Sequence, residues 1–431
     1  MSLCDPGSVQ CSQVRQKKRL DGDYSDSVPK MAQKEKDQLI VFACLLFWGM
    51  LGLFIPREYL RAYMVFASIC LAALYFFFVP PITYDLSRYY ELLHVIRKTD
   101  LWTVLFGDLK TNNILWETYS SGSRLYLLYA YIISLLRIDA LLPFISGVII
   151  YCCASKLVIL AAEDSEEEIA DWKLGFCFLF LLLMMDFRSI SGIRNMLTFT
   201  VFAYILYYDL VRKSNRLVCW IAYIALIGFH SAIIILVLLR LLMLFKHVPI
   251  FVRMLIAFSF FFFVETLIST LSRFTQYPMV SMLLQKLTDY FVYGGSTYQT
   301  TRVVIRSFAL VFYLLMYLYL KRSSFLPQVF NDYTDYFLLA AFFDFGTIGQ
   351  YDTFLRMHFF LTVAVCPMLL CFLHRIVGET PVEIVVPDNN ETGVKEVILY
   401  AMLGVSLIMV SYVFLTAYYS PMDGRFTFFL I

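Results

Sequence analysis

Apolar runs close to the length of a membrane-spanning helix recur along this chain and limit its fold more than any other feature. A helix needs about 20 mostly apolar residues to cross the hydrocarbon core of a bilayer. Runs near this length cover residues 39–55, 62–80, 140–162, 173–185, 193–210, 217–245, 249–271, 303–320, 336–345, 353–373 and 397–418. The sequence therefore predicts an all-α fold, a polytopic bundle of about 10–12 transmembrane helices.

Composition agrees with a membrane protein. Hydrophobic residues make up 60% of the 431 residues and charged residues 16%, whereas soluble domains are about 45–50% apolar and about 25% charged. The net charge is only +2, so we expect no nucleic-acid partner. The ten cysteines have neither metal-ligand spacing nor the pattern of a secreted disulfide framework. We expect packed thiols, no metal and no cofactor.

The chain divides into a polar tail, residues 1–38, and a single transmembrane domain, residues 39–431. We expect the tail to be disordered and see no cleavable signal peptide in it. Two long connections interrupt the apolar runs, at residues 82–124 and 272–302, and a further loop covers residues 375–396. Connections of this length are usually functional.

The distribution of Lys and Arg predicts an orientation, because these residues concentrate in cytoplasmic loops. Cytoplasmic positions for residues 212–216, 246–247, 321–322 and 374–375 place the acidic 163–171 loop and the 375–396 connection in the cytoplasm as well. The 82–124 and 272–302 connections, His230 and residues 188–194 and 346–356 then face outward. This topology requires two short helices in the 217–245 run, turning at 228–230. It also makes the 125–136 run, too short to span, a re-entrant or interfacial helix.

Three cations, Arg194, His230 and Arg356, lie inside or at the edge of apolar runs. An ionisable side chain at membrane depth costs several kcal/mol, about 2.5–3.5 for Arg, and is a functional candidate by default. Together with Arg188, these residues predict a wet cationic pocket that holds an anion. His230 is also a candidate catalytic residue, as a proton donor to phosphate or as a general base. The structural alternatives are an arginine that reaches lipid headgroups, a histidine packed in the core, and an Arg356–Asp352 ion pair.

A polar and aromatic cluster at residues 84–90 stands out in the first long connection. Because sugar-binding clefts combine tyrosine rings with carboxylates, Tyr89, Tyr90 and Asp352 are candidate sugar-binding residues. Asp85 is a candidate base for an acceptor hydroxyl, and Glu117 is the competing carboxylate. Both carboxylates could instead cap the helices that follow them. A further carboxylate, Asp344, is expected to pair with one of the cations near residue 356.

Several short segments, taken in order, resemble the EpsG-type family of bacterial exopolysaccharide and O-antigen polymerases. They are DLSRYY at 85–90, Glu117, SGIRN at 191–195, FHSA at 229–232 and FLRMHFF at 354–360. The resemblance covers roughly residues 39–373. It implies a GT-C-like arrangement of helices and a metal-independent enzyme of the bacterial plasma membrane. Such enzymes join polyprenyl-pyrophosphate-linked oligosaccharide units at the outer, periplasmic or exterior face.

The resemblance also implies roles for the candidate residues. Arg194, His230 and Arg356 would lie at the lipid pyrophosphate, a group to which we add Arg188 and Arg88, and Asp85 would be the acidic residue of the loop. The expected partners are the lipid-linked oligosaccharide, as donor and acceptor, the bilayer and a chain-length regulator protein.

Other functions remain open from the sequence. A GT-C-type transferase could add single sugars from a polyprenyl-phosphate donor, and a flippase or transporter could move the lipid-linked oligosaccharide. A membrane O-acyltransferase that uses His230 is a third alternative. The sugar, its linkage, the stereochemical outcome and the identity of the base are not encoded in hydropathy.

Overall fold

The computed structural model describes residues 41, 43–80, 85–106, 123–165, 169–185, 192–274, 300–322, 326–376 and 425–426. These residues are almost entirely helical, which confirms the predicted all-α class. Apart from a helical stretch at 43–51 and two short 3-10 turns, the helices are α3 (Arg57–Phe76), α4 (Asp85–Ile96), α5 (Leu101–Phe106), α7 (Arg124–Ser134), α8 (Leu141–Glu163), α9 (Asp171–Met184), α10 (Ile193–Leu210), α11 (Arg216–Phe229), α12 (Ile233–Leu242), α13 (Ile250–Leu271), α15 (Thr300–Arg322), α16 (Asn331–Gly346), α17 (Tyr351–Ala364) and α18 (Cys366–Ile376). One antiparallel pair joins β1 (Phe78–Val79) to β2 (Arg425–Phe426), with Phe78 opposite Phe426.

Few of the described helices meet the length and hydropathy expected of a complete membrane span. Glu58–Phe76 and Leu141–Glu163 do so by themselves. Thr353–Ala364 and Cys366–Arg375 do so only as a pair, bent by 49° at the break between them. These helices agree with a membrane protein. The count of about 10–12 spans stays a prediction, and the 397–418 run lies outside the described residues.

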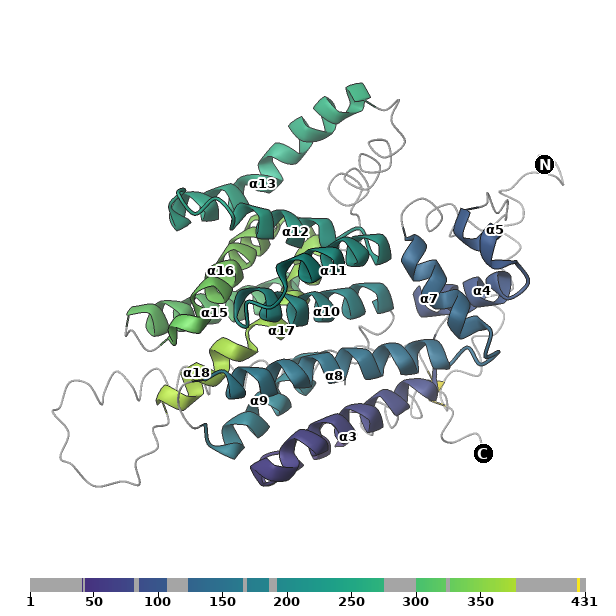
Figure 1. Ribbon diagram of the computed structural model, residues 1–431, viewed down its shortest axis with the longest axis horizontal. Coiled ribbons are helices and arrows are strands. Elements are labelled where there is room, and N and C mark those ends of the chain that lie inside the picture. The colour runs from purple at the N-terminus through teal and green to yellow at the C-terminus, as the bar shows by residue number, and fades with distance from the viewer. Residues whose placement is uncertain are drawn as a thin grey trace, which may run out of the picture.

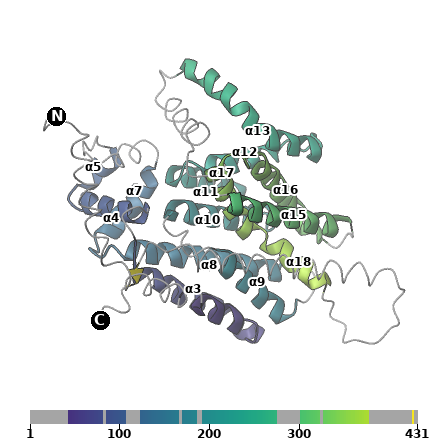
Figure 2. The same ribbon diagram turned by 180° about the vertical axis from the view of Figure 1, so that it is seen from behind.

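The helices form a bundle with a smaller helical group at one end. In Figure 1, α3 and α8 run side by side, and α10 and α11 follow on the other side of α8. The view from behind shows the same order (Figure 2). Helices α4, α5 and α7 gather beyond the ends of α10 and α11. We call this the α4–α7 end of the bundle.

Aromatic contacts establish that α10 and α17 run in the same direction. Phe202 of α10 lies against Phe360 of α17, with ring centroids 5.9 Å apart. Further along, Tyr207 of α10 contacts Tyr333 with centroids 5.6 Å apart, and the Tyr333 hydroxyl donates to the carbonyl oxygen of Ala364 at the end of α17. The first residues of both helices therefore lie toward the α4–α7 end.

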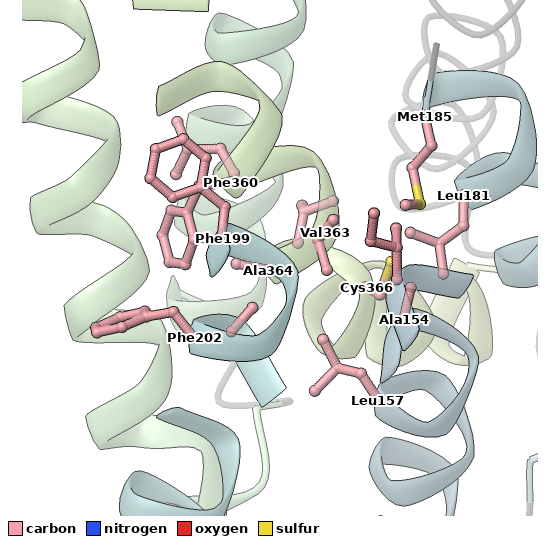
Figure 3. Close-up of a cluster of buried hydrophobic side chains, with 14 of the residues drawn as sticks. Ala154, Leu157, Leu181, Met185, Phe199, Phe202, Phe360, Val363, Ala364 and Cys366 are labelled. Atoms are coloured by element: carbon pink, nitrogen blue, oxygen red, sulfur yellow. The ribbon is translucent and has the colours of Figure 1, made fainter. Parts of the chain in front are cut away.

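The core lies where α8, α9, α10 and α17 meet, and its members are buried, apolar and mostly aromatic or branched. Figure 3 shows Ala154, Leu157, Leu181, Met185, Phe199, Phe202, Phe360, Val363, Ala364 and Cys366 in this region. Without a water-driven hydrophobic effect inside a bilayer, such packing stabilises helix association through close van der Waals contact. Small residues allow the closest approaches. A Cβ atom at Gly346 would lie 2.2 Å from the carbonyl oxygen of Phe258, so α13 and α16 meet there backbone to backbone.

Several local predictions are confirmed. The 217–245 run divides at His230 into α11 and α12, and the 125–136 run contains the short α7, 11 residues long. Its re-entrant or interfacial position stays a prediction. The 82–124 connection is not a plain loop, because it contains α4 and α5. Residues 1–38, 275–299 and 377–396 lie outside the described part, so the tail and most of the other two connections are not described.

The far end of the bundle gathers segments that the sequence placed together in the cytoplasm. Arg212 donates to both Glu163 (2.8 Å) and Asp164 (2.7 Å). The Lys173 ammonium lies 3.3 Å from Nδ1 of His374. The grouping of these loops at one end follows the prediction, while the side of the membrane that this end faces stays a prediction.

Candidate functional site

Arg194 lies in the first turn of α10 and contacts the helices of the α4–α7 end. Its Nε donates to the Tyr89 hydroxyl over 3.3 Å, and its Nη1 donates to the Ser123 hydroxyl over 3.2 Å. Its guanidinium carbon lies 5.5 Å from the ring centroid of Tyr126 and 5.9 Å from that of Tyr89. The Tyr89 and Tyr126 side chains are buried. The Arg194 side chain of α10 therefore packs against α4 and against the first residues of α7.

These contacts orient the guanidinium through uncharged hydroxyl groups and aromatic faces. Each cation–π contact contributes about 0.5–2 kcal/mol, depending on desolvation. The amino end of a helix adds exposed N–H groups and the positive end of the helix dipole, which favour anions. Arg194 at the start of α10 thus combines a held cation with a helix terminus suited to phosphate oxygens.

His230 lies close to the same aromatic cluster. It ends α11 with an extended backbone (φ −151°, ψ 114°), and its N–H donates to the carbonyl oxygen of Leu226 over 2.8 Å. Its buried ring lies 6.4 Å, centroid to centroid, from Phe199 of α10. The neighbouring Phe229 contacts Tyr126, with centroids 5.4 Å apart. His230 is therefore one residue away from a side chain that packs on the Arg194 site.

Arg356 lies toward the α4–α7 end as well. It precedes Phe360 by one helical turn, and Arg194 precedes Phe202 by about two turns. Because α10 and α17 run in the same direction and Phe202 contacts Phe360, both arginines lie on the same side of that contact. The structure thus places Arg194 and His230 beside the α4–α7 end, and Arg356 on the side of the Phe202–Phe360 contact that faces this end.

A buried acid–base pair lies on another face of α17. His358 Nδ1 is 3.5 Å from an Asp344 carboxylate oxygen, and both side chains are at most 3% exposed. The ring of Tyr313 stacks on that of His358, with an interplanar angle of 20°. Nearby, Arg306 donates to the carbonyl oxygen of Leu355 over 3.0 Å. Of the two residues near position 356 with which Asp344 was expected to pair, His358 is the one that lies beside its carboxyl group.

Residues 85–90 of the polar cluster predicted in the first connection lie on α4, which exposes some of their side chains and buries others. Asp85 is the first residue of α4, is exposed and pairs with Arg88 over 3.3 Å. An exposed pair of this kind contributes about 0–1 kcal/mol. Tyr89 points instead to Arg194 and is buried. Burial, and secondly the negative charge of Asp139, raise the pKa of Tyr90 well above its ordinary value, so its hydroxyl stays neutral at physiological pH.

Three predicted site residues are not placed by the structure. Glu117 and Arg188 lie outside the described residues, and Asp352 is described only as the second residue of α17. Within the described ranges, no group of three or more His, Cys, Asp or Glu side chains could hold a metal ion. Sequence reasoning missed Ser123, Tyr126 and Arg306. Of these three residues, Tyr126 was the easiest to predict from the sequence, because it lies in the short helix expected at 125–136.

Comparison with known proteins finds no match: no family model fits the sequence, and no curated protein or solved structure is significantly similar to the chain.

Proposed function

We propose that this protein is a membrane glycosyltransferase of GT-C-like helical arrangement that polymerises polyprenyl-pyrophosphate-linked oligosaccharide units in the bacterial plasma membrane. The growing chain on its lipid pyrophosphate is the donor, and a sugar hydroxyl of a new unit is the acceptor. The active site is the α4–α7 end, facing the periplasm or exterior. No metal takes part in this reaction.

The observation that supports the proposal is the placement of Arg194. Its guanidinium is held by Tyr89 and Ser123 at the amino end of α10. His230 lies near the same aromatic cluster, and Arg356 lies on the same side of the Phe202–Phe360 contact as Arg194. Glycosyl transfer from a lipid pyrophosphate increases the negative charge on the leaving group. A fixed donor in a water-poor site stabilises such charge by about 3–4 kcal/mol, so three cations can replace a metal ion.

We assign the activation of the acceptor hydroxyl to a carboxylate of the 82–124 connection. Asp85 is accessible at the start of α4, one turn before the Tyr89 that holds Arg194. In the proposed step, a carboxylate takes the proton of the acceptor hydroxyl. The hydroxyl oxygen then bonds to the anomeric carbon as the bond to the pyrophosphate oxygen breaks. A single displacement of this kind inverts the anomeric centre. Glu117 is the competing base.

The test is the size distribution of the polysaccharide from cells that carry Arg194→Ala, with the protein level in the membrane fraction measured in parallel. We expect loss of the high-molecular-weight ladder and accumulation of single lipid-linked units at the outer face. Arg216→Ala, at an exposed position at the far end, is the matched control and should leave the ladder unchanged.

Two results contradict the proposal. An unchanged ladder in Arg194→Ala removes this residue from the site. Accumulation of single units on the cytoplasmic side instead supports a flippase or transporter of the same lipid-linked substrate.

A further inference from the structure

The outer surface of α5 and of the end of α7 carries large apolar side chains that no described residue covers. Trp102 and Phe106 of α5 are 73% and 64% exposed, with ring centroids 4.5 Å apart. At the end of α7 and in the turn after it, Ile132, Leu135, Leu136 and Ile138 are between 48% and 60% exposed. These six residues lie on or directly after two helices that pack against each other, and we call them the α5–α7 apolar surface. Exposed apolar patches of this kind mark sites that contact a partner or a membrane.

The same helices are well packed on their other side. In α7, Leu127, Ala130 and Ile133 are buried, and in α5 Val104 is buried. Tyr126, also on α7, lies against the Arg194 guanidinium. The helices are therefore folded onto the bundle, and the apolar surface is not a consequence of poor packing. One face of α5 and α7 packs against protein, and the opposite face can contact lipid or another molecule.

The position of α8 indicates that this opposite face contacts lipid. Leu141–Glu163 is long and apolar enough to cross a membrane, and it begins only three residues after Ile138. The turn between α7 and α8 therefore lies near the level at which α8 enters the bilayer. Arg137, in the middle of this turn, is exposed and has a positive φ of 57°. A non-glycine residue in this left-handed region costs about 1–2 kcal/mol, so the turn is held in an unfavourable conformation.

The composition of the surface fits the boundary between headgroups and acyl chains. Tryptophan is enriched at this depth because its ring is apolar and its N–H is polar. The exposed cations Lys98 and Arg137 flank the apolar side chains and can pair with lipid phosphates while the apolar residues enter the acyl region. A protein partner would not require this proximity to the end of a spanning helix.

We propose that the α5–α7 apolar surface is inserted into the headgroup–acyl boundary of the leaflet at the α4–α7 end. The protein thus has an interfacial anchor there, with α7 lying between the lipid and Arg194. Insertion does not depend on the reaction proposed above. If that reaction is correct, Arg194 lies at the depth of the pyrophosphate of a lipid-linked substrate, and α7 lies between this site and the surrounding lipid.

The experiment measures the fluorescence of Trp102 in full-length protein in nanodiscs. Trp48, Trp116, Trp172 and Trp220 are replaced by phenylalanine, so that Trp102 alone reports. The lipids are brominated either near the headgroup or near the methyl end of the acyl chain, and iodide is the aqueous quencher. We expect strong quenching by the headgroup-proximal bromine, weaker quenching by the deeper bromine and little quenching by iodide.

The other outcomes overturn the proposal. Quenching by iodide without quenching by either bromolipid means that the surface faces water. Quenching by neither means that protein covers it, either a second copy or another segment of this chain. Should the four-fold variant fail to fold, the same quenching difference is measured between the natural protein and Trp102→Phe. Because no substrate is used, failure of this test leaves the polymerase test with Arg194→Ala unaffected.

Discussion

The Nε atom of Arg194 donates a hydrogen bond to the hydroxyl oxygen of Tyr89 over 3.3 Å, across a separation of 105 residues in the sequence. This bond joins the start of α10 in the bundle to α4 in the smaller helical group. A second donor of the same guanidinium reaches Ser123, just before α7. One side chain thus ties together the three elements that form the candidate site.

Tyr89→Phe removes the acceptor of this bond but keeps the ring below the guanidinium. The loss of one hydrogen bond should cost about 0.5–1.5 kcal/mol of stability. Under the proposed function it should also shorten the polysaccharide, because Arg194 is less well oriented. The measurements are the melting temperature of the purified protein and the ladder on a gel. Ser123→Ala should act similarly, and the double variant should lose more than the sum of both. Strict additivity would show that the two hydroxyls orient Arg194 independently.

Breaking the buried ion pair between Asp209 and Arg240 should be strongly destabilising. Nε of Arg240 lies 2.7 Å from an Asp209 oxygen, which also accepts from the Tyr223 hydroxyl, and both charged side chains are nearly inaccessible. Removal of one partner leaves an uncompensated buried charge, at a cost of about 3–5 kcal/mol. Asp209→Ala should lower the melting temperature far more than Arg88→Ala, which breaks an exposed pair. Equal effects of the two variants would contradict this view.

Gly346→Ala should separate α13 from α16. The new Cβ would lie 2.2 Å from the carbonyl oxygen of Phe258, which cannot move without its helix. Overpacking of this kind costs about 1–3 kcal/mol. Gly349→Ala is the matched control, because a Cβ there meets no atom within 4 Å. Thermal unfolding of the two variants under the same detergent conditions should distinguish them, and a Gly346→Ala protein as stable as the control would refute the close approach.

The start of α5 should respond to acid. Hydrogen bonds from Thr103 to the carboxylate of Asp100 hold the pKa of that carboxyl below its usual value of 3.8. Because the pKa is lowered in the folded state, the stabilisation is complete above about pH 3.8 and is lost as the pH falls through the lower folded value. Trp102 fluorescence should therefore change only below the usual carboxyl range. In Asp100→Asn, which cannot titrate, this step should disappear.

The sequence by itself determined the elements whose causes are local. Apolar runs define where helices form, and the weak helix formers Gly228 and His230 mark the break between α11 and α12. The 125–136 run was too short for a span, and α7 is correspondingly short. The two helices inside the 82–124 connection were missed because, at 12 and 6 residues, both are much shorter than the run of about 20 apolar residues that identifies a spanning helix.

Only the tertiary structure decided which side chains meet. Asp344 could have paired with Arg356 or His358 on sequence grounds, but these two residues are separated by about 200° around α17. The rotation of that helix against α16 selects His358. Likewise, nothing local relates Arg194 to Tyr89 or Ser123, since helices distant in sequence bring them together. Helix formation depends on neighbours within a few residues, whereas a site depends on how whole helices pack.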